Sequence, residues 1–243
     1  METSLLRGIE KNGCIHLALI DPEKSDRALP KTVEELEDLG TTAIMVGGST
    51  VASSQELDRA VKTIKNSCSL PVILFPNGLS GITRFADAIF FMSLLNSTKT
   101  QYLIGAQVLG APVVKRFSLE PIPLGYVLVG ESNTAVSSVG QADLIPYSRP
   151  DLAASYALAA QYLGMRFVYL EAGSGAGKPV EPTMVEKVVA AVDIPVIVGG
   201  GIKTPQQAQR LAKAGASAVV TGTVLEKEGT RQVGKIVAAL GRA

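Results

Sequence analysis

The sequence predicts a single modified (β/α)8 barrel, and three observations support this prediction. Eight short apolar runs recur along the chain, and most segments between them have the pattern of helices. The runs are continuously apolar rather than alternating, as expected for parallel strands that are covered on both faces. The chain has 243 residues, and such barrels typically have about 250 residues. No linker or low-complexity tract divides residues 1–243, so we expect one domain.

The eight expected strands are the apolar runs themselves. An open, doubly wound sheet would also fit alternating strands and helices. The glycine-rich ends of the last two runs favour closure into a barrel, because closed barrels commonly build a phosphate site there. The expected strands span residues 15–20, 42–46, 71–75, 88–92, 124–129, 167–171, 194–198 and 217–222.

Helices are expected between most of these strands. The segments with the clearest helical pattern are 33–40, 54–66, 149–164, 183–192 and 204–215. Hydroxyl side chains at the start of a helix accept hydrogen bonds from free N–H groups, and glycine commonly follows the last turn. On this basis we expect N-caps at Ser53, Thr183 and Thr204, and helix ends at Gly40, Gly164 and Gly215.

One helix is missing from the pattern. Only the twelve residues "PNGLSGITRFAD" (76–87) separate the third run from the fourth, and they contain a proline and two glycines. This length is too short for a crossover helix with its two loops. We therefore predict that the third helix is absent or replaced by an irregular segment.

Composition excludes several classes of function. The chain has 23 Lys and Arg against 22 Asp and Glu, which gives no reason to expect nucleic acid as a partner. No run approaches the roughly 18 apolar residues of a membrane span, and the N-terminus lacks the apolar core of a signal peptide. Cys14 and Cys68 have no metal-type spacing, which is typical of a cytoplasmic protein. His16 is the only histidine, which excludes a histidine-rich metal site.

Glycines at the ends of the last two strands predict a phosphate site. "GGGIKT" (199–204) and "TGT" (221–223) follow the seventh and eighth runs. In such barrels the loops after these strands and a nearby helix N-terminus bind phosphate through backbone N–H groups. A Cβ atom on the loop would hold the ligand oxygens away. Tight turns are the alternative explanation, although a turn alone needs only one glycine.

A glutamate stands at the end of the sixth run, next to this expected site. Glu171 is followed by "AGSGAG" (172–177), which leaves backbone amides and Ser174 accessible to a ligand. A carboxylate beside a phosphate is unfavourable unless it accepts a proton or holds a hydroxyl. The alternative is a structural ion pair, for example with Lys203. Tyr169 either points into the mouth of the barrel or serves in packing.

Oxygen ligands gather at the ends of the first two strands. Asp21, Ser49 and Thr50 suit Mg²⁺, which takes one or two carboxylates and completes its shell with water and substrate phosphates. Asp-Pro also marks turns, so a purely structural role for Asp21 is equally open. Asn77, Lys24 and Lys203 are candidate further donors, with a surface or structural role as the alternative.

Seven motifs together resemble the geranylgeranylglyceryl phosphate synthases and their bacterial relatives, the heptaprenylglyceryl phosphate synthases. The similarity covers about residues 15–226, and "YLEAGSGA" is its most specific part. "LIDPEK" resembles the archaeal type-two branch, whereas the bacterial branch has "KLDP" at this point. The resemblance implies a modified barrel that lacks the third helix. The motifs are "LIDPEK", "MVGGST", "PVILFPNG", "AIFFMSLLNS", "YLEAGSGA", "VGGGIKT" and "VTGTVLE".

The resemblance also implies an activity and its residues. The family joins the C3 hydroxyl of sn-glycerol 1-phosphate to a long prenyl diphosphate and releases diphosphate. Mg²⁺ would bind at Asp21 and Ser49, and Glu171 and Tyr169 would be catalytic. The expected glycerol phosphate residues are Tyr169, Leu170, Glu171, Ala172, Gly173, Ser174, Gly175, Gly200, Gly201, Gly222 and Thr223.

Partners beyond the two substrates also follow from the resemblance. The type-two branch is commonly oligomeric, so we expect a dimer or a hexamer. We also expect a peripheral membrane contact when the lipid-like product is released. An apolar groove is needed for the prenyl tail, and candidate segments are "QYLIGAQVLGAPVV" (101–114) and "PLGYVL" (123–128), whose alternative role is core packing.

Two other functions stay open at this point. The first is another phosphate-binding barrel, an isomerase or synthase, which often needs an acid/base pair at the ends of strands 1 and 5. Strand 5 ends in "LVGES", where Glu131 is the only carboxylate. The second is a barrel that binds a phosphorylated ligand without catalysis.

Overall fold

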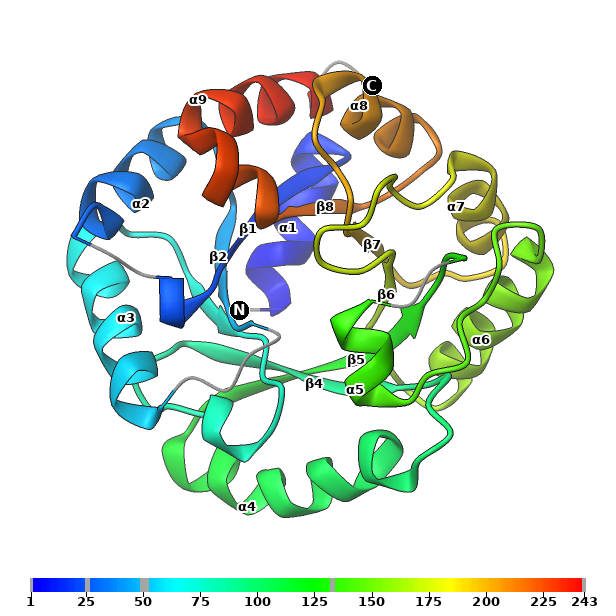
Figure 1. Ribbon diagram of the computed structural model, residues 1–243, viewed down its shortest axis with the longest axis horizontal. Helices are drawn as coiled ribbons and strands as arrows, with labels where there is room; N and C mark the ends of the chain where they lie inside the picture. Colours follow the sequence, from blue (N-terminus) through cyan, green and yellow to red (C-terminus); the bar gives the residue numbers. More distant parts are fainter. Residues whose placement is uncertain (1, 25–26, 49–52, 132–133, 242–243) are drawn as a thin grey trace.

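The computed structural model is a closed barrel of eight parallel strands (Figure 1). It describes residues 2–24, 27–48, 53–131 and 134–241. Each strand pairs with the next one in the chain, and β1 closes the ring with β8. The predicted barrel is therefore confirmed, and the open sheet is excluded. The strands are β1 Ile15–Ile20, β2 Ala43–Val46, β3 Val72–Leu74, β4 Ala88–Leu94, β5 Glu120–Leu128, β6 Phe167–Glu171, β7 Val196–Gly199 and β8 Ala218–Thr221.

Helices form an outer ring around these strands (Figure 1). Only the 3₁₀ turn η2, Leu79–Gly81, lies between β3 and β4, so the predicted loss of the third helix is confirmed. The helices are α1 Glu2–Asn12, α2 Leu29–Asp38, α3 Ser54–Ser67, α4 Ala106–Phe117, α5 Ala135–Gly140, α6 Pro150–Tyr162, α7 Pro182–Val189, α8 Pro205–Lys213 and α9 Thr223–Leu240. Two further short turns are η1, Pro22–Lys24, and the π-helical η3, Gln101–Gly105, which leads into α4.

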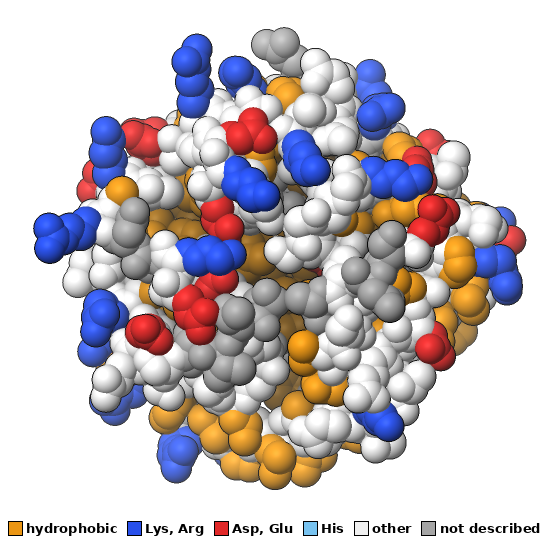
Figure 2. Space-filling view, viewed as in Figure 1, with side chains coloured by type: hydrophobic (Ala, Val, Ile, Leu, Met, Phe, Trp, Pro, Cys, Tyr) orange, Lys and Arg blue, Asp and Glu red, His pale blue; other side chains and the backbone are white. Residues whose placement is uncertain are grey.

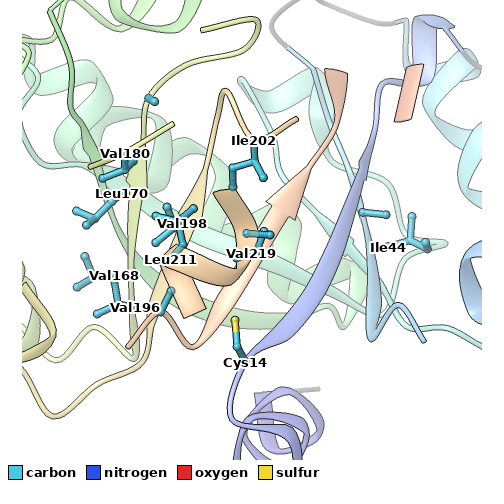
Figure 3. Packing of buried hydrophobic residues seen from close by; sticks show 14 of the residues in the cluster. Cys14, Ile44, Val168, Leu170, Val180, Val196, Val198, Ile202, Leu211 and Val219 are labelled. Carbon is cyan, nitrogen blue, oxygen red and sulfur yellow. The ribbon is translucent and has the colours of Figure 1, made fainter. Parts of the chain in front are cut away.

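The apolar core has two layers because side chains alternate between the two faces of each strand. In β1, Ile15 and Leu17 point into the barrel, whereas Ala18 and Ile20 pack outward against the helices. Part of the outer layer is seen in Figure 3, where side chains of β6, β7 and β8 lie near Leu211 of α8. Continuous apolar runs are required for this arrangement, since both faces of every strand are buried.

The N-terminal helix closes one end of the barrel. Leu5 of α1 is buried and belongs to the inner apolar cluster, beside Ile15 and Leu17. The sequence patterns above did not predict α1 or the short helix α5. Since α1 covers the N-terminal ends of the strands, the opposite end is left for a ligand.

Most of the predicted helix ends are confirmed. Ser53 and Thr204 each accept a hydrogen bond from the backbone of the first turn, in α3 and α8. The predicted cap at Thr183 is wrong, because α7 begins with Pro182 and has Glu181 at its N-cap position. The glycines that end three helices have the positive φ that favours glycine: 88° at Gly40, 82° at Gly164 and 95° at Gly215.

Candidate active site

A cavity of about 240 Å³ opens at the C-terminal ends of the strands. Asp21 at the end of β1 and Glu171 at the end of β6 both line it, so the two carboxylates face the same end of the barrel. Figure 2 shows a hollow near the middle of this face, with apolar side chains on its floor. The expected ligand regions therefore belong to one site.

Glu171 is buried at the mouth of this cavity. Its Oε1 accepts a hydrogen bond from the backbone N–H of Gly173, at 2.6 Å. Burial raises the pKa of Glu171, and the Tyr169 hydroxyl and the Gly173 N–H only partly oppose this effect. Within the described residues the carboxylate has no ion pair with Lys203, so the structural alternative fails. A carboxylate with raised proton affinity is suited to accept a proton.

Tyr169 points into the barrel and is fully buried. Its ring packs against Phe75 and Tyr126, with centroid distances of 5.6 and 5.3 Å. In the described part of the chain its hydroxyl has no hydrogen-bond partner of normal geometry, although it interacts electrostatically with Glu171. Both earlier possibilities are thus realised, since the ring packs and the hydroxyl lines the cavity. The hydroxyl therefore faces the cavity beside the Glu171 carboxylate, where it can also contact a bound ligand.

Three glycines at the end of β7 and directly after it are required by neighbouring protein atoms. A Cβ at Gly199 would overlap the Tyr169 hydroxyl, and one at Gly200 would overlap Glu171 Oε1. Gly201 similarly approaches the carbonyl of Lys178. Gly200 and Gly201 also have positive φ, 82° and 69°. Close packing thus explains why these three positions carry no side chain, and the backbone of Gly200 and Gly201 lines the cavity.

The start of α9 has the properties of an anion site. Gly222 occupies the N-cap position of α9 and has no side chain to accept from the first turn, whereas α8 is capped by Thr204. The Thr223 hydroxyl lies 3.4 Å from Ser174 Oγ, so both hydroxyls border the same part of the cavity. Free N–H groups and the helix dipole favour a phosphate here.

The Asp21 side of the cavity carries a network of charges. Asp21 accepts from the backbone N–H of Glu23 at 3.1 Å, and its Oδ2 lies 3.4 Å from Lys24 Nζ. Lys24 also donates to both carboxylate oxygens of Glu226, at 3.0 and 3.1 Å. Gly48 faces the Asp21 carboxylate at a distance that leaves no room for a Cβ. Ser49 and Thr50 lie outside the described residues.

The donors around Asp21 fit Mg²⁺ better than a transition metal. Among the described residues no cluster of three or more His, Cys, Asp or Glu side chains is present. A single carboxylate beside a space for phosphate oxygens is nonetheless a common Mg²⁺ arrangement, because substrate and water supply the other ligands.

An apolar groove extends from the cavity into the gap left by the missing helix. Residues of η2, β4, α4 and α5 line it. From the predicted segment 101–114, Tyr102, Gln107 and Gly110 reach the groove, together with Ala106 and Val114. From the second predicted segment, 123–128, only Tyr126 does, and its other side chains pack in the barrel wall. The apolar lining includes Leu79, Ile82, Ile89, Phe90, Phe91, Met92, Val136 and Val139.

The structure brings together most, but not all, of the predicted glycerol phosphate residues. The cavity lining includes Tyr169, Glu171, Ser174, Gly175, Gly200, Gly201, Gly222 and Thr223. Leu170 and Ala172 pack in the outer apolar layer instead, because alternate side chains of β6 point away from the barrel. Gly173 contributes through its backbone N–H, which donates a hydrogen bond to the Glu171 carboxylate.

Sequence reasoning missed two parts of the cavity. Phe75 contacts Phe90, Tyr126 and Tyr169 in an aromatic wall. Alternate residues of a strand point into the barrel, and this alternation was a signal that could have located the wall. The ion pair between Lys24 and Glu226 joins the two ends of the chain, and no local pattern indicates such a contact.

The fold and the site define a phosphate-binding (β/α)8 barrel with a groove for an apolar chain. Residues 7–240 match the PcrB family, and the chain belongs to this family.

Individual relatives are similar over almost their whole length. The geranylgeranylglyceryl phosphate synthase of Pyrococcus abyssi is 55% identical over 90% of this chain and 86% of its own. That of Methanothrix thermoacetophila is 50% identical over 99% of this chain and 95% of its own. The crystal structure of the Thermoplasma acidophilum enzyme in complex with the substrate sn-glycerol 1-phosphate has a TM-score of 0.95, 44% identity, and coverage of 100% of this chain and 99% of its own.

Within the described residues, no helix combines the length and the apolar character that crossing a membrane would need.

Proposed function

We propose that this protein is a geranylgeranylglyceryl phosphate synthase, a prenyltransferase of archaeal-type membrane lipid biosynthesis. It forms an ether between the C3 hydroxyl of sn-glycerol 1-phosphate and geranylgeranyl diphosphate. The observation that carries the proposal is the position of Glu171, in one cavity with an uncapped helix N-terminus and an apolar groove. Relatives at 50–55% identity with this name support it.

The glycerol phosphate binds at the start of α9. Its phosphate accepts hydrogen bonds from the free N–H groups there and from the hydroxyls of Thr223 and Ser174. The buried Tyr169 hydroxyl lines the cavity beside Glu171 and is placed to bond the same ligand. This binding fixes the acceptor so that the attack becomes effectively intramolecular.

Glu171 orients the C3 hydroxyl and accepts its proton. The new bond forms between the hydroxyl oxygen and C1 of the prenyl chain, while the bond from C1 to the diphosphate oxygen breaks. The diphosphate leaves with the electron pair of that bond. The burial that raises the pKa of Glu171 makes it a stronger base than an exposed glutamate. A positioned base of this kind typically contributes about 10²–10⁴-fold.

Mg²⁺ is the cofactor that we propose for the diphosphate. Asp21 would hold it, with Ser49 as the second proposed ligand. When bound, Mg²⁺ stabilises the negative charge that develops on the leaving diphosphate. Lys24 lies beside Asp21 at the edge of the cavity and adds a positive charge on the same side.

The prenyl tail occupies the groove between η2, β4, α4 and α5. Its lining is almost entirely apolar, which suits a long hydrocarbon chain. Phe75, Phe90 and Tyr126, which form the aromatic wall, line the same cavity as Glu171 and help to exclude water from the reacting carbon.

A direct assay tests the proposed function. The protein is incubated with sn-glycerol 1-phosphate, labelled geranylgeranyl diphosphate and Mg²⁺, and the product is extracted into organic solvent. We expect a labelled phosphate ester that disappears on chelation of Mg²⁺. Binding of sn-glycerol 1-phosphate without this product would favour a non-catalytic barrel, and absence of both would favour another phosphate-binding isomerase or synthase.

We place the reaction in the cytoplasm, because Cys14 and Cys68 are both free thiols, as is usual in a reducing compartment.

We also propose a homo-oligomer, a dimer or a hexamer. Ile104, Val108 and Leu109 are more than half exposed on η3 and α4, and contact between copies would cover them. Light scattering of the wild type and of Val108→Glu tests this contact. A peripheral membrane contact would assist release of the water-insoluble product.

A further inference from the structure

The only histidine of the chain lies outside the proposed chemistry, yet it is bonded on both sides. His16 is the second residue of β1 and is fully buried. The neighbouring residues Ile15 and Leu17 point into the barrel, so the imidazole points outward, between the strands and the helices. It therefore cannot touch a substrate in the cavity.

The imidazole bridges two buried threonines. Nδ1 lies 3.0 Å from the hydroxyl of Thr41, and Nε2 lies 2.8 Å from the hydroxyl of Thr221. Burial lowers the pKa of His16 to about 3, so the ring is neutral. A neutral imidazole donates from one nitrogen and accepts at the other, so each ring nitrogen has one matched threonine partner.

Thr221 leads directly into the phosphate site. It is the last residue of β8, and the next residues, Gly222 and Thr223, form the start of α9. Gly222 has φ −129° and ψ −73°, outside the usual helix and strand regions. Since the N-cap residue Gly222 has no side chain to cap α9, the direction of the first N–H groups of the helix depends on how firmly the end of β8 is held.

We propose that His16 is a positioning residue for the phosphate site, which it serves by holding Thr221 and so the peptide groups at the start of α9. The inference rests on the proposed function, because it assigns this site to the glycerol phosphate. Thr41 anchors the other side of the imidazole, at the turn between α2 and β2. A connection thus runs from that turn, through the wall of the barrel, to the cradle at its opposite end.

Two amide variants separate the two hydrogen bonds. The amide group of His16→Asn reaches the place of Nδ1 and retains the bond to Thr41. The amide group of His16→Gln reaches the place of Nε2 and retains the bond to Thr221. Both variants keep a buried polar group with one partner, so a merely structural role predicts similar effects for the two. A positioning role predicts different effects on the binding of glycerol phosphate.

The measurements are the KM values for both substrates and the Kd of sn-glycerol 1-phosphate by calorimetry. We expect His16→Asn to raise the KM and Kd for glycerol phosphate about tenfold, as the loss of one hydrogen bond predicts. His16→Gln should raise them by no more than about threefold. The KM for geranylgeranyl diphosphate should stay within about twofold of wild type in both.

The threonines supply an independent pair of variants. Thr221→Val should reproduce the effect of His16→Asn, and Thr221→Ser should restore wild-type binding. Thr41→Val is the matched control, because it removes the same kind of hydroxyl from the other side of His16. Thermal unfolding of each variant shows whether it is folded.

Either of two results would overturn the proposal. One is equal KM and Kd for glycerol phosphate in the two histidine variants. The other is unchanged binding in Thr221→Val. If neither histidine variant folds, the threonine variants decide the matter alone. Should wild type show no turnover, the proposed function fails, while the Kd values for sn-glycerol 1-phosphate still test the role of His16.

Discussion

The Oε1 atom of Glu171 occupies the space in which a Cβ on residue 200 would stand. Glu171 ends β6 and Gly200 follows β7, the neighbouring strand, so the carboxylate is held over the adjacent loop. The preceding residue, Gly199, likewise leaves room for the Tyr169 hydroxyl, which a Cβ at this position would overlap. These two glycines thus place the proposed base and its neighbouring hydroxyl.

Gly200→Ala should therefore abolish activity by displacing Glu171. We expect kcat to fall at least 10²-fold, as for loss of a positioned base. The substitution also strains the backbone, since φ is 82° at this position. Gly164→Ala is the matched control, because Gly164 has the same φ of 82° and open space around it. If kcat fell equally below wild type in the two variants, backbone strain, and not the displacement of Glu171, would be the cause.

Glu171→Gln should lower kcat by about 10²–10⁴-fold and yet stabilise the protein at neutral pH. The pKa of Glu171 is raised above the ordinary 4.5. The folded state therefore binds more protons than the unfolded state between pH 4.5 and this raised pKa. The unfolding free energy of wild type therefore falls as pH rises through this window. The advantage of the variant should grow with pH from 4.5 upward, as measured by urea unfolding.

The exposed Glu186 provides the control for this experiment, because Glu186→Gln should change neither kcat nor stability. Turnover of Glu171→Gln within about threefold of wild type would remove the catalytic role of Glu171.

Gly222→Ala should affect binding without affecting folding. A Cβ here would make only ordinary contacts, at 3.5 Å from atoms of Leu19. The new methyl group would instead stand at the start of α9, where we propose that the phosphate binds. We expect a KM for sn-glycerol 1-phosphate at least tenfold higher, with an unchanged unfolding midpoint. An unchanged KM would place the phosphate elsewhere in the cavity.

The barrel could be predicted because its signals are local. Each buried strand is an apolar run, and the gap between Phe75 and Ala88 is too short for a helix whatever the rest of the chain does. Glu171 and Asp21 were found for the same reason, since both stand where a strand ends. These features depend on a few consecutive residues and on the known direction of parallel strands.

Other features depend on contacts between distant segments. The role of Gly200 requires the position of Glu171, 29 residues earlier, and the bond from His16 to Thr221 spans 205 residues. Thr183 was wrongly predicted as the N-cap of α7, because the N-cap is Glu181, two residues earlier, and Pro182 is the first residue of the helix. No local pattern carries such information, so the reason for each glycine and the partners of the histidine became clear only in three dimensions.

The length of the prenyl groove should be controlled from α4. Gly110 lines the groove, and a Cβ there would lie 3.5 Å from Ile82 and 3.8 Å from Leu79. Alanine therefore fits, whereas a phenylalanine ring would fill the groove. We expect Gly110→Phe to lower kcat/KM for geranylgeranyl diphosphate at least tenfold relative to a shorter prenyl diphosphate, and Gly110→Ala to preserve the ratio. The ratio is measured with both donors in competition, and an unchanged ratio in Gly110→Phe would place the tail outside this groove.

Acid should destabilise the protein in part through His16. The pKa of His16 is about 3 in the folded state against an ordinary 6.5, so the unfolded state binds an additional proton between these values. The unfolding free energy contributed by this group is therefore complete above pH 6.5 and is lost as pH falls toward 3, by up to about 1.4 kcal/mol for each pH unit. Glu171 acts in the opposite direction, but only above pH 4.5.

In urea unfolding between pH 7 and 4, wild type and Thr41→Val, which both keep the imidazole, should lose stability more steeply than His16→Gln. Parallel curves for all three would mean that the imidazole takes up a proton in the folded protein, which its burial between Thr41 and Thr221 does not allow.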